Sequence, residues 1–401
     1  MASGQTRLAV KIRPPESGRA QVTYAAAFIH PAIVAVDAAD DGWDFTVAEP
    51  VDRAILESGL RALIERFRTP PPPSPAPEFR LEPPRGFGDK RALGDLKARG
   101  AMQEIARGLF VFREPVSTLL RFLDAAILAR FAAPFSAREE TYPNCIPVAD
   151  LGRADHLASF PEHLHFLTHL TQDLALLDRF AARARDQGAA VAPSRDETAA
   201  VELVQNPSTC YHCYAARRGS EVPENLALTA LAKCHRFEAA NHRDTGRLLE
   251  FSLREVIFLG DGAFMRASRA RTVDLMTALA QDWRLYGELV AANDPFFTSD
   301  YEIKAAHQRR MAMKMEYRAA LPGEAATLAV MSSNLHGVSF GKAFDITRAG
   351  RPIQTGCLGF GHERLALALI AQHGIEAEHW PARLREEFTA WQTNDPIART
   401  T

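Results

Sequence analysis

The stretch that most constrains this chain is RLLEFSLREVIFLG at residues 247–260, which follows the segment HRFE and the loop AANHRDTG. Alternating faces are expected in a β-strand, so every second side chain of this run lies on one surface. That surface is apolar except for Arg247 and Glu255. At about 3.3 Å per residue, Phe251 and Glu255 lie roughly 13 Å apart on it. The run predicts a long strand that presents one carboxylate and one aromatic ring on an otherwise apolar face.

The segment before the loop predicts a second strand, with Arg236 and Glu238 on a common face. A hairpin through the glycine-containing loop would place these side chains beside those of the following strand. Two arginines, a carboxylate and an aromatic ring would then gather in one place. Taken alone, the hairpin favours the simpler interpretation, a sheet surface with ordinary cross-strand ion pairs.

Two further stretches favour a specific chemistry. TGCLGFGHERLALALI, residues 355–370, has a glycine-rich turn that leads into an apolar helical run with Arg364 in its first turn, and NPSTCYHCY occupies residues 206–214. Together with the hairpin they resemble the catalytic core of class II aminoacyl-tRNA synthetases, with the hairpin as motif 2 and GFGHER as motif 3. The seryl branch is the most similar, because its strand after the loop reads Arg-x-x-x-Phe-x-x-x-Glu, which this chain also has.

Within that branch, the pattern of Cys210, Glu255 and Cys357 is similar to the zinc-dependent archaeal seryl enzymes and to their truncated bacterial relatives, the amino acid:carrier protein ligases. The resemblance covers roughly residues 100–375. It implies an α+β fold, in which an antiparallel class II synthetase sheet is flanked by helices. A small amino-terminal α+β domain would precede it.

The cysteines allow two metal sites. Cys210 and Cys213 have the spacing of a zinc knuckle, but the pair that would complete it, Cys234 and His235, is adjacent in sequence and has poor geometry for a four-ligand site. The resemblance implies instead a catalytic Zn²⁺ on Cys210, Glu255 and Cys357, with an open position that takes the neutral α-amine of an amino acid. The alternative is that these are three unrelated buried residues.

The resemblance also assigns the nucleotide site. Arg236 would hold the α-phosphate of ATP and the substrate carboxylate, Glu238 would contact the adenine amino group, and Phe251 would stack on adenine. Arg364 would cover the other face of the base in a cation–π sandwich. Arg236, Glu238 and Arg364 are the expected catalytic residues, and Arg247 and Leu248 complete the nucleotide-binding set.

Composition limits the partners. The 401 residues are 47% hydrophobic and 24% charged, which suits one large or two smaller globular domains. The net charge of −2 gives no overall basic field for nucleic acid, so tRNA is not an expected partner. Five cysteines favour thiols and metal ligands over disulfides. The amino terminus has no long apolar run and no segment is long enough to span a bilayer, so we expect a cytoplasmic protein without membrane contact.

The chain divides at a proline-rich segment. Residues 7–50 contain β-rich runs (RLAVKI, QVTYAAAFI, AIVAV, WDFTVA) and a helical pattern follows, which predicts a small α+β domain of unknown role at 1–68. TPPPPSPAPEFRLEPPRG at 69–86 reads as a stiff, extended linker without packed elements. Residues 87–401 form the expected catalytic domain.

A long amphipathic helix is predicted from Pro115, followed by an extended stretch, TYPNCIPVADL, that contains Pro147. A helix followed by a proline-containing strand resembles class II motif 1, which implies a homodimer. Any core helix beside a strand is the simpler alternative. In the next segment, LASFPEHLHF, we expect His163 and His165 to pack or face solvent, because lone histidines seldom bind metal.

One position departs from the seryl pattern. That branch has a metal-binding glutamate at the start of the strand before motif 3, where this chain has Val330, so the role of Mg²⁺ is in doubt. Between the two motifs, a helical insertion at about 270–323 is expected. Its central helix would be basic, and a basic helix would attract an acidic carrier protein; the cations are Lys304, Arg309, Arg310, Lys314 and Arg318.

The sequence thus predicts an AMP-forming ligase that activates a small amino acid, of the glycine, alanine or serine class, and passes it to the phosphopantetheine thiol of a carrier protein. One alternative is a seryl-type aminoacyl-tRNA synthetase. The other is a catalytically silent paralogue that acts as a binding or regulatory dimer, which the valine at position 330 would suit. The amino acid and the carrier are not specified by the sequence.

Overall fold

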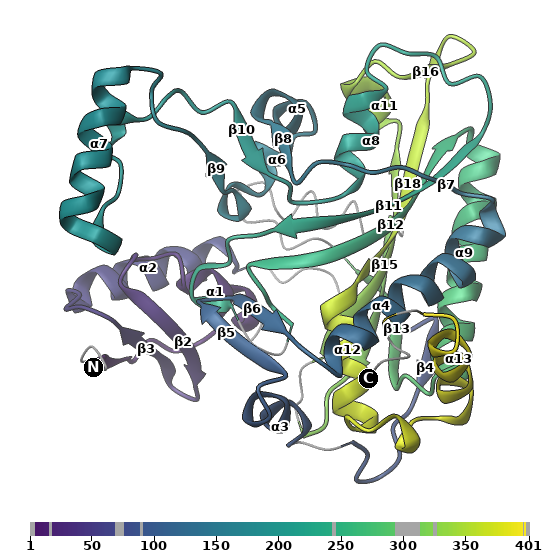
Figure 1. Ribbon diagram of the computed structural model, residues 1–401. Helices are drawn as coiled ribbons and strands as arrows, with labels where there is room; N and C mark the ends of the chain where they lie inside the picture. Colours follow the sequence, from purple (N-terminus) through teal and green to yellow (C-terminus); the bar gives the residue numbers. More distant parts are fainter. Residues whose placement is uncertain are drawn as a thin grey trace.

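The computed structural model describes residues 5–15, 18–68, 76–88, 91–242, 246–292, 313–323, 327–395 and 397 (Figure 1). Its centre is an eight-stranded sheet in which β7 is parallel to β11 and the other neighbours are antiparallel. In spatial order the strands are β4 (Phe79–Leu81), β13 (Gly287–Ala292), β14 (Lys314–Ala320), β15 (Thr327–Gly337), β18 (Gln354–Gly361), β12 (Glu250–Gly260), β11 (Leu226–His235) and β7 (Arg138–Glu139). The expected antiparallel α+β core is confirmed.

The central strands are apolar on both sides because both faces of the sheet are covered. On β12, Val256 and Phe258 point into the main core, and the alternate residues Ile257 and Leu259 point into a second cluster. The main core is closed by α4 (Val116–Ile127), α9 (Gly262–Asp282), α12 (His362–His373) and α13 (Ala382–Gln392). The second cluster is closed by α8 (Cys210–Ala216) and α11 (Ser339–Ala343).

Smaller elements surround this core in Figure 1. A three-stranded sheet has the order β8 (Cys145–Pro147), β10 (Leu203–Gln205), β9 (Phe166–Leu167), and a hairpin joins β5 (Met102–Ala106) to β6 (Leu109–Phe112). The remaining elements are α3 (Ala92–Ala98), α5 (Val148–Arg153), α6 (His156–Ser159), α7 (Leu174–Gln187), β16 (Thr347–Arg348) and β17 (Arg351–Pro352).

The amino-terminal unit has its own sheet and core. It comprises β1 (Thr6–Val10), α1 (Arg19–Ala26), β2 (Ile33–Ala39), β3 (Gly42–Val47) and α2 (Arg53–Arg66), with the sheet order β1-β3-β2. The expectation of a strand at QVTYAAAFI was wrong, because residues 21–26 lie in α1 and residues 27–29 in the turn that follows it. Val22, Ala25 and Ala26 share the buried side of the helix, and the alanines favour helix.

Two segments around the sheet differ from the prediction. Residues 79–81 of the expected linker form the edge strand β4, paired with β13, because Phe79 packs against the main core. Lys314 and Arg318 of the expected basic helix lie on strand β14. Residues 69–75 of the linker and 293–312 of the insertion, with Lys304, Arg309 and Arg310, lie outside the described residues. The division into units at 1–68 and 87–401 stays a prediction.

The motif 1 region is also rearranged relative to the prediction. The long helix is present as α4, which continues through a π-helical turn to Ala132. The strand with Pro147, however, covers only Cys145–Pro147 and belongs to the small sheet. The element that joins this region to the large sheet is β7.

The hairpin of β11 and β12 is confirmed, with His235 opposite Glu250 next to the connecting loop. Both strands are shorter than predicted, so Arg236 and Glu238 follow β11, and Arg247 precedes β12. Behind the hairpin, the buried Arg254 forms ion pairs of 2.8 Å with Asp124 of α4 and with Glu139 of β7. These pairs fix β12 against the helical layer.

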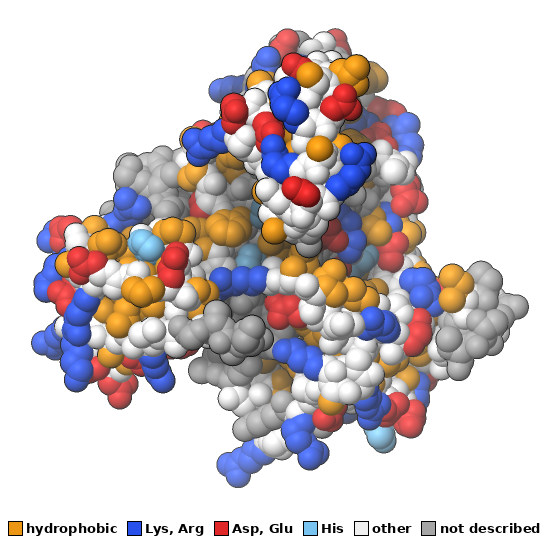
Figure 2. Space-filling model, turned by 60° about the vertical axis from the view of Figure 1, so that its left-hand side comes forward, with side chains coloured by type: hydrophobic (Ala, Val, Ile, Leu, Met, Phe, Trp, Pro, Cys, Tyr) orange, Lys and Arg blue, Asp and Glu red, His pale blue; other side chains and the backbone are white. Residues whose placement is uncertain are grey.

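Charged side chains of both signs are interspersed over the face that Figure 2 presents, in keeping with the net charge of −2. Within the described part of the chain, no helix combines the length and apolar character that crossing a membrane requires.

Candidate functional site

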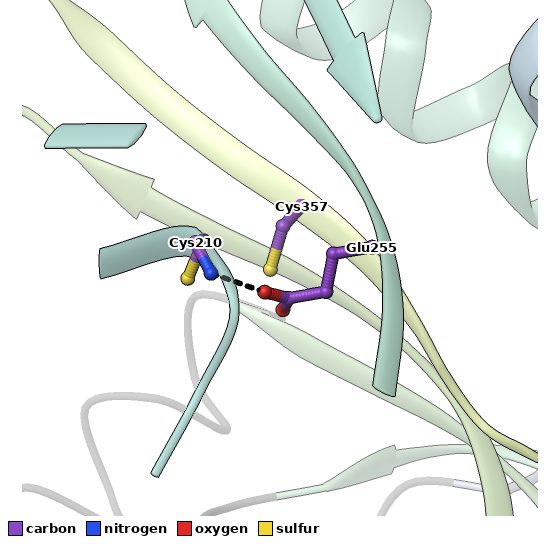
Figure 3. Close-up of side chains that lie close together, drawn as sticks. All are labelled: Cys210, Glu255 and Cys357. Atoms are coloured by element: carbon purple, nitrogen blue, oxygen red, sulfur yellow. Dashed lines mark hydrogen bonds between the residues drawn. The ribbon is translucent and has the colours of Figure 1, made fainter. Parts of the chain in front are cut away.

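Cys210, Glu255 and Cys357 come together on one face of the large sheet (Figure 3). Cys210 begins α8, Glu255 lies in the middle of β12, and Cys357 lies on the neighbouring β18, where Ile257 is its partner in the register. One ligand atom from each residue lies within 4.8 Å of the other two, and all three residues are buried. The backbone N–H of Cys210 also donates to the Glu255 carboxylate. Helix α8 and the sheet therefore hold the three side chains in one place.

Strand β15 supplies polar neighbours that the sequence reasoning missed. The amide of Asn334 donates to the sulfur of Cys357 at 3.5 Å, and a ring nitrogen of His336 lies 3.8 Å from the same sulfur. Ser208 lies 3.7 Å from the sulfur of Cys210. Asn334 pairs directly with Cys357 across β15 and β18, so only the register reveals that they share a face.

The electrostatics of the three residues suit a bound cation. Burial raises the pKa of the Glu255 carboxyl, although the bonds from the two cysteines and the nearby Arg236 oppose the shift. The contact with Cys210, together with burial, raises the pKa of the Cys357 thiol well above its ordinary value. The pKa of Cys210 is also raised by burial and by Glu255, against the lowering effect of its bond with Cys357. Three acids crowded in a buried place ionise together only around a positive ion.

The donor set suits Zn²⁺. Two thiolates and one carboxylate are ligands that zinc accepts, and three protein ligands are typical of sites with an open position. The knuckle cysteines have other contacts: Cys213 is approached by the guanidinium of Arg217 at 3.6 Å, and Asn206 and Thr209 lie within 3.8 Å of the sulfur of Cys234.

The residues proposed for the nucleotide lie at the loop end of the hairpin. The guanidinium of Arg236 lies 5.3 Å from the centre of the Phe251 ring, and its Nε donates to the carbonyl of Pro207 at 3.2 Å. Glu238, only 5% exposed, forms an ion pair with Arg247. Leu248 is buried next to this pair in sequence. The hairpin thus gathers two arginines, a carboxylate and an aromatic ring.

Arg364, expected to cover the second face of the base, is held by backbone carbonyl groups. Its Nε donates to the carbonyl of Gly246 at 2.7 Å, and Nη1 to that of Ala329 at 3.4 Å. Burial lowers the pKa of Arg364 to about 10. Among the described residues, the cation over Phe251 is Arg236, and Arg364 contacts no carboxylate within ion-pair distance. The guanidinium of Arg364 is thus held by two carbonyl groups, which leaves its charge without a direct counter-ion.

Val330 has a structural explanation. It is the extra residue of a β-bulge between the pairs Tyr317–Met331 and Arg318–Ala329, and its side chain is buried in the main core. On the other face, Glu316 of β14 is in register with Ser332, Gly359 and Glu255. The carboxylate of Glu316 is bonded by Lys314 and Arg318 at 3.0 and 2.9 Å. The sequence analysis placed Lys314 and Arg318 on a helix. It therefore did not predict that Glu316 and its two cations lie on a strand of the sheet that carries the site.

Glu162 is a further buried acid that the sequence gave no signal for. Its side chain is 2% exposed, and neither carboxyl oxygen has a hydrogen-bond partner among the described residues. His163 and His165 beside it pack on Phe160 and Phe237, as expected. Burial, aided by repulsion from Glu238, raises the pKa of Glu162 to about 7.

This shift predicts a pH-dependent stability. In the unfolded chain the Glu162 carboxyl loses its proton near about pH 4.3, whereas in the folded protein it keeps the proton up to about pH 7. The burial of this carboxyl therefore does not destabilise the fold below about pH 4, and the destabilisation grows as the pH rises to about 7. Because each pKa unit corresponds to about 1.4 kcal/mol, Glu162→Gln should raise the free energy of unfolding at about pH 8 by up to about 3 kcal/mol. Urea unfolding at about pH 8 and about pH 4 checks this, with the exposed Glu57→Gln as control. An equal gain at both pH values would contradict the assignment.

Comparisons with known proteins show the family to which this chain belongs. No protein-family model matches the chain. The chain is 31% identical over 277 residues to amino acid:acyl-carrier-protein ligase 2 of Bradyrhizobium diazoefficiens, an alignment that covers 67% of this chain and 80% of that protein. It is 24% identical over 316 residues to the type-2 serine–tRNA ligase of Methanopyrus kandleri, covering 73% of this chain and 59% of that enzyme.

The fold agrees. The structure of M. kandleri seryl-tRNA synthetase in complex with A. aeolicus tRNASec aligns with a TM-score of 0.70 at 20% identity, covering 96% of this chain and 78% of that one. The part of this chain outside the alignment, 4% of its residues, is only about a quarter as long as the amino-terminal unit. The structural similarity therefore extends into that unit, beyond residues 100–375 to which the sequence resemblance was limited. With its class II synthetase fold and its likeness to the Bradyrhizobium enzyme over most of both chains, the protein belongs to the amino acid:acyl-carrier-protein ligases.

Proposed function

We propose that this ligase uses ATP to activate a small amino acid as its adenylate and then transfers it to the phosphopantetheine thiol of a carrier protein. The observation that supports this most strongly is the group of Cys210, Glu255 and Cys357 on the sheet face next to the Arg236–Phe251 pair. A site for an α-amine and a site for a base would then lie on one surface. The carrier as acceptor is taken from what the Bradyrhizobium relatives are named for.

In the first step, a carboxylate oxygen of the amino acid attacks the α-phosphorus of ATP and pyrophosphate leaves. Arg236 is suited to hold both the substrate carboxylate and the α-phosphate, because its planar fork stays charged throughout. Glu238 would accept from the adenine amino group, next to the ring of Phe251. Arg364, which has no carboxylate partner among the described residues, has charge available for phosphate or for the face of the base. Acceleration arises from orientation and electrostatics.

Cys210, Glu255 and Cys357 would hold Zn²⁺. The ion would act as a Lewis acid toward the neutral α-amine, so an amino acid would be selected through a group that all amino acids share. Discrimination among glycine, alanine and serine would then depend on the pocket walls. In the second step, the carrier thiol attacks the carbonyl of the adenylate and AMP leaves.

Position 330 is a valine and not the glutamate of the seryl pattern, and its side chain is buried in the main core. We therefore assign no step to a magnesium ion held there. An acidic carrier would dock on the basic residues predicted between β13 and β14. Three of these, Lys304, Arg309 and Arg310, belong to the segment 293–312, which lies outside the described residues. Lys314 and Arg318, both bonded to Glu316, are not part of a helical docking surface.

Loading of a holo-carrier protein with radiolabelled glycine, alanine or serine tests the proposal. We expect ATP-dependent label on the holo-carrier, none on the apo-carrier, and none on tRNA. Label on tRNA with a bare carrier would favour a seryl-type synthetase, to which the archaeal relatives point. Absence of amino-acid-dependent pyrophosphate exchange would favour a silent paralogue, the reading that Val330 supports.

A further inference from the structure

The amino-terminal unit is packed directly on the loop that follows β11. Ala240 belongs to the same hydrophobic core as the unit's own buried residues, and Phe160 packs against that core from the catalytic side. The amide of Asn241 donates to the carbonyl of Tyr24 on α1 at 2.9 Å. In Figure 1 the unit lies beside the end of the β11–β12 hairpin where the loop joins the two strands. The loop is therefore part of a shared core with the amino-terminal unit.

The same loop is held from another side by the turn between β5 and β6. The carbonyl of Gly108 accepts from the N–H of Leu249 at 2.8 Å, and Arg107 donates to the carbonyl of Val34 in β2 at 2.6 Å. A side chain at Gly108, where φ is +73°, would come within 2.9 Å of the ring of His242. This close contact leaves the loop little freedom to move independently of its neighbours.

Tyr24 of the amino-terminal unit contacts Arg247, the arginine that pairs with Glu238, the residue assigned to the adenine amino group. The guanidinium of Arg247 lies 5.4 Å from the centre of the Tyr24 ring, and the same guanidinium pairs with Glu238. Tyr24, Arg247 and Glu238 therefore form a chain of contacts from α1 to the carboxylate that would accept from the adenine amino group. A cation that is held on both sides has less freedom to leave its carboxylate.

Polar atoms beside this chain are left for a ligand. The hydroxyl of Tyr24 and both carboxyl oxygens of Glu162 are buried without a hydrogen-bond partner among the described residues. A ring nitrogen of His163 lies 3.8 Å from one of the Glu162 oxygens, beyond hydrogen-bond distance. Leaving such atoms unpaired is costly, so they are expected to be satisfied when a ligand is bound. A group with N–H donors fits these acceptor atoms, and the amino group of a nucleobase has that chemistry.

We propose that the amino-terminal unit forms one wall of the nucleotide site, with Tyr24 as the positioning residue that holds Arg247 against Glu238. The inference rests on the proposed function and extends it to a unit whose role the sequence left open. Tyr24 acts through Arg247 and contacts no reacting atom, so its loss affects the binding of ATP and not that of the amino acid.

The test compares Tyr24→Leu with Tyr24→Phe in the full-length protein. The leucine variant loses the ring and should raise the KM for ATP in pyrophosphate exchange by about fivefold to tenfold, with the KM for the amino acid unchanged. The phenylalanine variant keeps the ring and should stay within about twofold of the wild type. In an Arg247→Ala background, Tyr24→Leu should have no further effect, because the residue through which it acts is gone.

Trp43→Phe is the control for a loosened amino-terminal unit. It removes the 2.8 Å hydrogen bond from the indole to Thr23 in the same unit but keeps both Tyr24 and Arg247, and it should leave both KM values unchanged. Equal effects on the two KM values, additive losses in the double variant, or an unchanged KM for ATP in Tyr24→Leu would overturn the inference. A wild-type protein without any exchange would instead refute the proposed function, and calorimetric titration with ATP would then still measure the effect of Tyr24 on binding.

Discussion

Replacement of Cys357 by serine should remove the bound divalent metal and suppress amino-acid-dependent pyrophosphate exchange by more than about a hundredfold, equivalent to about 2.7 kcal/mol of transition-state stabilisation. Serine has nearly the same shape, but its hydroxyl does not ionise at neutral pH, so a group of two thiols and an acid loses one of its anionic donors. Elemental analysis of the purified protein should find about one zinc ion per chain in the wild type, and little in the variant.

Cys213→Ser is the matched control. Cys213 is also buried and lies three residues after Cys210, yet it contacts Arg217 and is not among the three gathered side chains. Its metal content and exchange activity should equal those of the wild type. Loss of zinc from Cys213→Ser with retention in Cys357→Ser would revive the knuckle and contradict the site proposed on the sheet.

Arg364→Lys should lower kcat/KM for ATP by about a hundredfold to a thousandfold. Lysine keeps the charge, but it has neither the planar surface that covers a base nor the fork that binds two phosphate oxygens. It also fails to reproduce the two bonds to the carbonyls of Gly246 and Ala329 that orient the wild-type side chain. Pyrophosphate exchange at varied ATP concentrations measures the effect.

The comparison for this variant is Arg130→Lys. Arg130 is likewise partly buried, but it pairs with Asp282 and Glu387 in the helical layer behind the sheet. Its activity should stay within about twofold of the wild type, although some stability is lost. If both variants lost activity equally, the effect of Arg364→Lys would reflect folding and not nucleotide binding.

Much of the architecture was predictable because long, regular patterns determine it. The alternation in residues 247–260 predicted β12 and the face on which Glu255 lies, and the apolar periodicity after Pro115 and after Gly361 predicted α4 and α12. Helical periodicity was also present in QVTYAAAFI, at Val22, Ala25 and Ala26, but the β-branched and aromatic residues suggested a strand. Local propensity was outweighed there by the packing of α1 on the amino-terminal core.

The errors fall where a segment's structure depends on a distant partner. Residues 79–81 look like linker but form β4, because β13, some 200 residues later, offers a free edge. Lys314 and Arg318 suit a helix in composition, yet they lie on β14 because β13 and β15 pair on both sides. Val330 is placed in the core by a bulge, a one-residue offset that leaves no mark in the sequence.

By itself, the sequence determined the residue types and the periods: two cysteines, two acids, three arginines and a ring, on or beside strands and helices whose faces repeat regularly. The tertiary structure alone decided which of them meet. Cys210, Glu255 and Cys357 become neighbours through the register of β12 on β18 and the position of α8, and Tyr24 reaches Arg247 through the packing of one unit on another. The reason is physical: periodicity is a local property of the backbone, whereas proximity depends on long-range pairing and on the burial that makes it favourable.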